Sequence, residues 1–88
     1  MDTAALNRLR WRCTHRAMRE MDVLLGGFLE RSYPGLNPEQ AAAFVALAEM
    51  EDTELWPLVV GRRMCSDPVQ AELVVMLRNI GVRQDQAG

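Results

Sequence analysis

The segment HRAMREMD, residues 15–22, places a histidine, two arginines and two carboxylates within eight positions. Arg16 and Glu20 are four residues apart, so on a continuous helix they project from the same side, with Asp22 on the opposite flank. An ion pair of this kind on a solvated helix contributes only about 0.3–0.5 kcal/mol. Periodicity alone therefore favours a surface ion pair without a function.

Basic and aromatic residues nearby change this interpretation. One exposed surface where the first two helices meet would be lined by Arg8, Trp11, Arg12, His15, Arg16 and Glu20. A tryptophan among arginines, held on rigid helices, is typical of a protein-binding hot spot. Partial burial of Trp11 against a neighbouring helix is an equally good interpretation of that residue.

The same residues do not suggest an enzyme. His15 is the single histidine of the chain, and no nucleophile is placed to pair with it, so we interpret it as a turn or surface residue rather than a general base. Cys13 and Cys65 are isolated and lack the spacing of metal ligands. We expect both thiols to be reduced and to pack as small hydrophobic side chains. We predict no catalytic residue, no metal and no stably bound cofactor.

Charge is distributed unevenly along the chain. The net charge is −2, but residues 1–19 carry +4 and residues 20–54 carry −7. A sequence pI of about 5.3 argues against a general nucleic-acid binder, although the arginine-rich start keeps that class as the weakest alternative. There is no apolar run of membrane-spanning length and no signal-peptide core, so we expect a cytoplasmic protein that stays where it is made.

Apolar residues recur at helical spacing, and no stretch alternates for long enough to make a convincing strand. We predict that a first helix starts near residue 4 and ends at a turn near Thr14. A second helix runs from about Arg16 to Arg31. The buried positions expected on these two helices are Leu6, Leu9, Cys13, Met18, Met21, Leu24, Leu25, Phe28 and Leu29.

Capping patterns mark the later helices. NPEQ, residues 37–40, is a capping-box pattern that opens a third helix to about Met50. A short fourth helix follows the acidic stretch EMEDTELW, with Pro57 fitting only near its start and Gly61 at its end. DPVQ repeats the cap signature and opens a fifth helix, which Gly81 closes. The buried positions expected on the third and fifth helices are Ala41, Phe44, Leu47, Ala48, Val69, Leu73, Met76, Leu77 and Ile80.

These elements add up to an all-α fold. We predict a compact single-domain five-helix bundle over residues 1–88, with a helical core at about residues 4–81 and a frayed tail at residues 82–88. A chain of 88 residues is near the size at which one hydrophobic core is adequate but thin.

The stretch LRWRCTHRAMREMDVLLGGF resembles the signature region of the small bacterial and mitochondrial flavinylation factors for succinate dehydrogenase, the SdhE family. The hallmark of that family is Arg-Gly-x-x-Glu, followed in many members by an aspartate two residues later. Arg16, Glu20 and Asp22 stand at these positions, and Trp11 precedes the motif at a distance seen in members. The resemblance continues more weakly through LNPEQAAAFVALAEMEDTELWPLVVG and covers about residues 6–61.

The resemblance implies a five-helix assembly chaperone rather than a metabolic enzyme. Such proteins bind the flavoprotein subunit of succinate dehydrogenase, or of the related fumarate reductase, and promote covalent attachment of FAD to a histidine of that client. On this basis Arg16 and Glu20 are expected to contact the client near its flavin domain, and the free protein is expected to be a monomer. We expect Arg16→Ala or Glu20→Ala to leave the fold intact and to reduce covalent flavin in the client.

Ala17 departs from the pattern, because the family has glycine after the motif arginine. On a helix that continues from Arg16 this position points towards the buried side, where a methyl group could shift the helix, obstruct the client, or be tolerated as a better helix former. The departure leaves open a paralogue with a different client, and a helical adaptor that shares the motif by chance is a further alternative. The residues predicted to bind a partner are Arg8, Trp11, Arg12, His15, Arg16, Ala17, Glu20 and Asp22.

Overall fold

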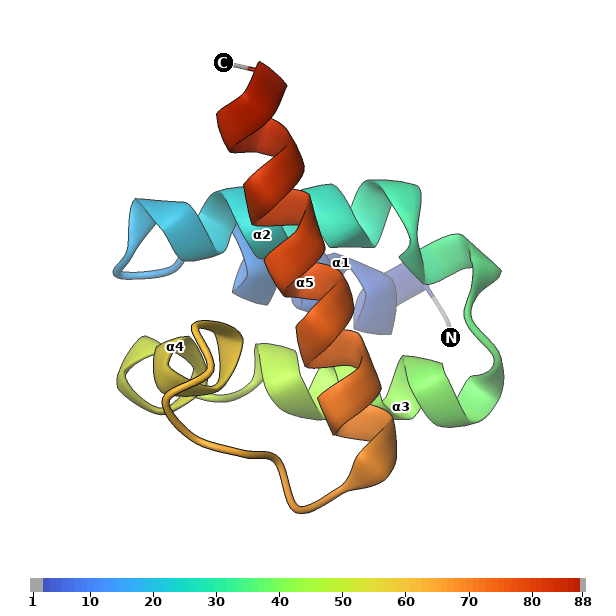
Figure 1. The fold of residues 1–88 in the computed structure, drawn as a ribbon. Coiled ribbons are helices and arrows are strands. Elements are labelled where there is room, and N and C mark those ends of the chain that lie inside the picture. Colours follow the sequence, from blue (N-terminus) through green and yellow to red (C-terminus); the bar gives the residue numbers. More distant parts are fainter. Residues whose placement is uncertain (1–2, 88) are drawn as a thin grey trace.

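The computed structural model of the chain describes residues 3–87, with side chains described as far as residue 80. Within that range it contains five α-helices and one 3₁₀-helix, which confirms the all-α prediction (Figure 1). The elements in chain order are α1 (Thr3–Thr14), α2 (Arg19–Arg31), η1 (Tyr33–Gly35), α3 (Pro38–Ala48), α4 (Asp52–Val59) and α5 (Pro68–Ala87).

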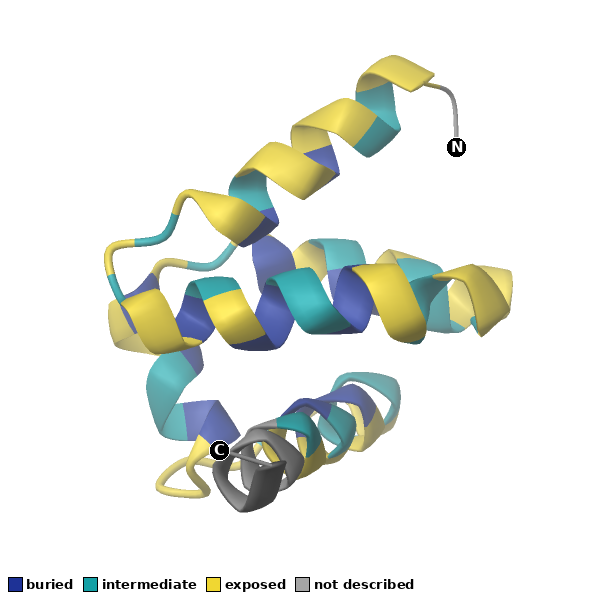
Figure 2. Ribbon diagram, turned by 90° about the horizontal axis from the view of Figure 1, so that it is seen from above, coloured by how far each residue is buried: buried dark blue, intermediate teal, exposed yellow. Residues whose placement is uncertain are grey.

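Helix α2 lies between α1 and α5. Helices α1 and α2 form an antiparallel pair, and α5 crosses the other side of α2 and continues over α3 (Figure 1). Figure 2 shows that α1 is exposed along much of its length, with its buried residues turned towards α2. The turn between α1 and α2 therefore lies at an edge of the bundle, where another protein can reach it.

Apolar faces from all five α-helices form one core. Phe28 of α2 and Phe44 of α3 are fully buried and stack with ring centroids 4.7 Å apart. Most of the predicted core positions are buried, namely Leu9, Cys13, Met21, Leu24, Leu25, Phe28, Leu29, Phe44, Leu47, Ala48, Leu73 and Leu77. On α3, however, Ala43 faces the core and Ala41 is only half-buried.

Side chains and backbone geometry at the helix ends follow the predicted chemistry. The Asn37 side chain accepts a hydrogen bond from the Gln40 amide at 2.8 Å, and the Gln40 side chain accepts one from the Asn37 amide at 3.1 Å, which confirms the capping box of α3. Asp67 caps α5 by accepting from the Val69 amide at 3.1 Å.

Helix α4 ends in a Schellman arrangement around Gly61. The Gly61 amide donates to the Leu58 carbonyl at 3.3 Å, and the Arg62 amide donates to the Pro57 carbonyl at 2.8 Å. Gly61 has a φ of +86°, a left-handed conformation that glycine adopts without strain. The prediction that this glycine ends the helix is confirmed. Pro57 is not near the start of α4 but in its second turn.

Two predicted helix ends are wrong. Helix α2 begins at Arg19 rather than Arg16, because Met18 is extended, with φ −98° and ψ 125°. Helix α5 continues to Ala87, so Gly81 does not end it and the expected tail is helical over residues 82–87, whereas Gly88 lies outside the described residues. One glycine costs a helix only about 1 kcal/mol relative to alanine, which is too little to terminate it without a competing structure.

No helix in the described part of the chain combines the length and the apolar character needed to cross a membrane.

Candidate functional site

Residues 15–18 form the turn between α1 and α2, and side chains from other segments fix its backbone. The Arg16 amide donates to Asp22 Oδ1 at 2.7 Å, and the Met18 amide donates to Asp52 Oδ2 at 2.9 Å. Amides at the start of a helix have no partner within that helix, so the two carboxylates satisfy donors that would otherwise be unpaired. They hold residues 16–18 as a turn, and α2 starts three residues later than its sequence predicts.

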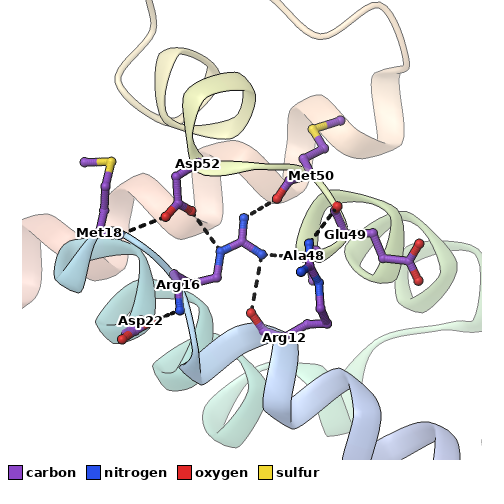
Figure 3. A network of polar contacts seen from close by, with 8 residues as sticks. All are labelled: Arg12, Arg16, Met18, Asp22, Ala48, Glu49, Met50 and Asp52. Atoms are coloured by element: carbon purple, nitrogen blue, oxygen red, sulfur yellow. Dashed lines mark hydrogen bonds and ion pairs between the residues drawn. The ribbon is translucent and has the colours of Figure 1, made fainter.

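The Arg16 guanidinium points into the protein and is fully bonded there (Figure 3). Its Nε donates to Asp52 Oδ1 at 2.8 Å, and the two side chains are only 3% and 7% exposed. The remaining nitrogens donate to three backbone carbonyls at the end of α1, at the end of α3 and just after α3, those of Arg12, Ala48 and Met50. This is a buried ion pair whose hydrogen-bonding groups are satisfied.

The prediction that Arg16 pairs with Glu20 on one helix face is therefore wrong. Arg16 lies before α2 and pairs with Asp52, while Glu20 is exposed in the first turn of α2. The Arg16 side chain does not present itself to a partner, which corrects its predicted role as a direct contact. Arg16→Ala would leave Asp52 as an unpaired buried charge, so we expect this change to destabilise the fold rather than to leave it intact.

Ala17 is exposed in the turn rather than directed towards the buried side of a helix. Its position between Arg16 and Met18 places it between two backbone amides that are both held by carboxylates. Within the described residues only a glycine has positive φ, so the Ala17 backbone is one that any residue can adopt. Of the outcomes considered for the Ala17 methyl group, a shift of the helix by close packing does not occur, because the residue is exposed.

Trp11 and His15 form an exposed aromatic pair at the end of α1. The rings are stacked with centroids 4.5 Å apart and planes 10° apart, and Trp11 is 55% exposed. His15 Nδ1 lies 3.0 Å from the Trp11 carbonyl, which can only accept, so Nδ1 is the donor in this contact. Of the two interpretations of Trp11, the structure favours the exposed one.

Arg8 and Arg12 lie on the side of α1 that faces α3. They line a shallow groove between these helices together with Val45 and Glu49. Arg12 is half-buried and donates to the Glu49 carbonyl at 2.9 Å, whereas Arg8 is exposed. The structure thus leaves Arg8 accessible and uses Arg12 to join α1 to the end of α3.

The predicted site residues separate into two groups. Those with exposed side chains, which we call the α1–α2 face, are Arg8, Trp11, His15, Ala17 and Glu20. The other three support this face through hydrogen bonds to other parts of the protein, and they are Arg12, Arg16 and Asp22. Trp11 and His15 stack within the exposed set, which also holds one cation and one carboxylate, a composition suited to protein recognition.

Asp52 is the residue of this site that the sequence interpretation missed. The stretch EMEDTELW was interpreted as negative charge at a helix N-terminus, in which Asp52 was one acid among several. A signal was present, because Asp52 precedes Leu55 by three positions and Val59 by seven, which places it on the apolar stripe of α4. An acid on such a stripe requires a buried partner.

The two cysteines are free thiols. Cys13 is fully buried, and this burial raises the pKa of its thiol from the ordinary value of 9.0 to about 11, against the opposing effect of Arg16. Cys65 is half-buried, and burial raises its pKa as well. Among the described residues, no three His, Cys, Asp or Glu side chains are grouped so that they could hold a metal ion.

Comparison with known proteins places these features in a family. A family model described as the flavinator of succinate dehydrogenase matches residues 7–81. The chain belongs to this family. The predicted assignment to a succinate dehydrogenase assembly factor is therefore confirmed at the level of the family, and the match extends beyond residue 61 into the last helix.

Individual relatives agree with the family model. FAD assembly factor SdhE of Shewanella oneidensis is 38% identical over 78 residues, which are 89% of this chain and 94% of that protein. The protein of the same name from Pseudomonas aeruginosa is 39% identical over 79 residues, 90% of this chain and 89% of the relative. That from Idiomarina loihiensis is 39% identical over 67 residues, 76% and 73% of the two chains.

Proposed function

We propose that this protein binds the flavoprotein subunit of succinate dehydrogenase and promotes covalent attachment of FAD to it. Membership of the flavinator family supports the client and the reaction. The observation that carries the site assignment is the α1–α2 face, an exposed aromatic pair on a turn whose backbone is fixed by buried charges. A surface that is already ordered loses little conformational entropy when a partner docks.

In this proposal the client supplies the reacting histidine and holds the flavin, and the assembly factor contributes no catalytic group and no stable FAD site of its own. Docking on the α1–α2 face would hold the flavin site of the client in a productive geometry, which lowers the entropic part of the barrier. Trp11, His15, Ala17, Glu20 and Arg8 make the contacts. Arg12, Arg16 and Asp22 support them from behind.

The free protein is proposed to be a monomer in the bacterial cytoplasm, where a dehydrogenase subunit is available before it is assembled. The bacterial origin of the relatives supports this compartment. The flavoprotein subunit of fumarate reductase is proposed as a second client, because its covalent flavin poses the same chemical task.

Variants of the exposed residues test the proposal without disturbing the core. Trp11→Ala and Glu20→Ala are expected to lower covalent flavin in the succinate dehydrogenase subunit, measured by in-gel flavin fluorescence, with helical content by circular dichroism unchanged. Val75→Ala is the matched control for Trp11→Ala, because Val75 is 48% exposed on α5. Normal flavin attachment with both face variants would contradict the site assignment.

A paralogue with a different client is the second candidate, and Ala17 is the observation that favours it. Ala17→Gly restores the family residue at an exposed position of negative φ, so the fold is expected to lose only about 0.4–1 kcal/mol. If the methyl group hinders this client, Ala17→Gly raises flavin attachment. Unchanged attachment, together with a pull-down from the host that recovers other proteins, would favour the paralogue.

A further inference from the structure

The carboxylate of Asp52 holds two points of the α1–α2 turn at once (Figure 3). Oδ1 accepts from Arg16 Nε at 2.8 Å, and Oδ2 accepts from the Met18 amide at 2.9 Å. The exposed residue between these two anchors is Ala17. Asp52 itself is the first residue of α4 and only 7% exposed, so it does not reach a partner.

We propose that Asp52 is a positioning residue of the α1–α2 face, which fixes the turn backbone that presents Ala17 to the flavoprotein subunit. This inference rests on the proposed function, because it assigns a role in docking to a residue that does not touch the client. It also ties that face to the connection between α3 and α4, which lies outside the motif at residues 16–22.

The role requires a carboxylate, because both groups that face Asp52 are donors. An aspartate accepts through each of its two oxygens, whereas an asparagine offers one oxygen and one NH₂ group. In Asp52→Asn the single oxygen stays with the charged Arg16 Nε, since charge-assisted hydrogen bonds are the stronger ones, and the Met18 amide then faces the NH₂ group. The variant is nearly isosteric, so it removes one anchor of the turn without opening a cavity.

Arg16 stays in place when that anchor is lost, since its other nitrogens donate to the carbonyls of Arg12, Ala48 and Met50. The Arg16 amide also stays bonded to Asp22. The segment that gains freedom is thus the one that follows, at Ala17 and Met18. A purely structural role for Asp52 would instead predict a general loss of stability with no local change in the turn.

Arg78→Met is the matched control. Asp52 lies at the start of α4, and Arg78 of α5 holds the end of α4, so both variants weaken contacts of that helix. Arg78 Nε donates to the Val59 carbonyl at 2.7 Å, and a terminal nitrogen donates to the Leu58 carbonyl at 3.3 Å. Both variants lose hydrogen bonds from α4, but only Asp52→Asn alters a contact to the turn. The two are compared at a temperature at which circular dichroism shows both to be folded.

The experiment measures the turn and the docking separately on the full chain. Amide chemical shifts of Asp52→Asn are expected to change at Ala17 and Met18 and to stay unchanged along α5. Affinity for the purified flavin-free subunit of succinate dehydrogenase, measured by calorimetry, is expected to fall at least about tenfold, as for the loss of one charge-assisted hydrogen bond. Arg78→Met is expected to bind the subunit like the unmodified protein.

Equal affinity of Asp52→Asn and the unmodified protein would overturn the proposal, as would equal losses in Asp52→Asn and Arg78→Met. If Asp52→Asn does not fold, the double variant Arg16→Met with Asp52→Leu replaces it, because buried ion pairs can be exchanged for apolar residues. Full affinity of the folded double variant for the subunit would again contradict the positioning role of Asp52. Failure of the unmodified protein to bind the subunit would instead refute the proposed function. The amide chemical shift of Met18 in Asp52→Asn would still show whether Asp52 holds the turn.

Discussion

One guanidinium joins four segments of this small protein. Arg16 leaves the turn after α1, donates to the carbonyl of Arg12, reaches the end of α3, and pairs with Asp52 at the start of α4. The planar fork of arginine can serve several acceptors at fixed angles, which the single ammonium of lysine cannot do. The motif arginine therefore acts first on the fold, and the exposed face depends on it.

Replacing Arg16 is expected to destabilise the protein strongly. Arg16→Ala leaves the buried Asp52 carboxylate unpaired, which typically costs about 3–5 kcal/mol. The stability of Arg16→Lys should lie between that of Arg16→Ala and that of the unmodified protein, because lysine restores the charge but not the contacts to the carbonyls. Urea unfolding followed by circular dichroism measures the difference. A midpoint within error of the unmodified protein for Arg16→Ala would contradict the buried pair.

Cys13 is expected to make stability depend on pH in the alkaline range. Burial raises the pKa of its thiol in the folded protein from 9.0 to about 11, so the folded state retains a proton that the unfolded chain has released. Stability is therefore fully present below about pH 9 and declines as the pH rises towards 11.

The free energy of unfolding between pH 8 and 11 measures this effect. Cys13→Ala serves as the reference, because other groups titrate in the same range and their contribution is common to both proteins. The unmodified protein should lose more stability across the window than Cys13→Ala does. Parallel pH profiles for the two proteins would show that the thiol does not contribute.

At this scale the sequence predicted which residues lie at the junction of α1 and α2, but not their structural roles. Periodicity placed Trp11, His15 and Glu20 near the junction of two helices, and they are exposed there. It could not show that Arg16 is buried, because the groups that bury it come from residues 48–52, more than thirty positions away. Local spacing carries no information on such a partner.

Among the elements, the ends set by local hydrogen bonds were predictable. The capping box of α3, the Asp67 cap of α5 and the glycine after α4 each depend on residues within five positions of one another. The start of α2 was not predictable, because the turn before it is held by Asp52, which accepts from the Met18 amide and is 34 positions away in the chain. Tertiary contacts override local propensity at that end.

Gly61 and Gly35 give a matched test of the turn geometry after α4. Gly61→Ala is expected to lower the free energy of unfolding by about 1–2 kcal/mol, since an alanine at φ +86° is strained. Gly35→Ala is expected to be neutral or slightly stabilising, because a methyl group there meets nothing within 4 Å.

Thermal unfolding of the two alanine variants measures this difference, and flavin attachment in the client should be normal with both. Neither glycine lies in the α1–α2 face. Equal melting temperatures for the two variants would contradict the left-handed assignment at Gly61.

Across the whole molecule, opposite charges in the chain are brought together. The basic residues 1–19 and the acidic residues 20–54 meet in the ion pair of Arg16 with Asp52, and Arg12 donates to the backbone carbonyl of Glu49 at the end of α3. The helical periodicity was sufficient to predict the all-α bundle, because each apolar stripe needs a neighbouring helix to cover it. The uneven charge, by contrast, could be interpreted either as a nucleic-acid patch or as internal pairing.

The structure distinguishes these two interpretations and yields a prediction. Two of the five arginines in residues 1–19 are occupied inside the protein, so they cannot form a free row against phosphates. We expect no binding to a fluorescent 20-nucleotide RNA or duplex DNA by anisotropy at 150 mM salt, under conditions where the flavoprotein subunit still binds. Micromolar nucleic-acid affinity that falls steeply with added salt would reverse this conclusion, because such a slope counts phosphates neutralised by free cations.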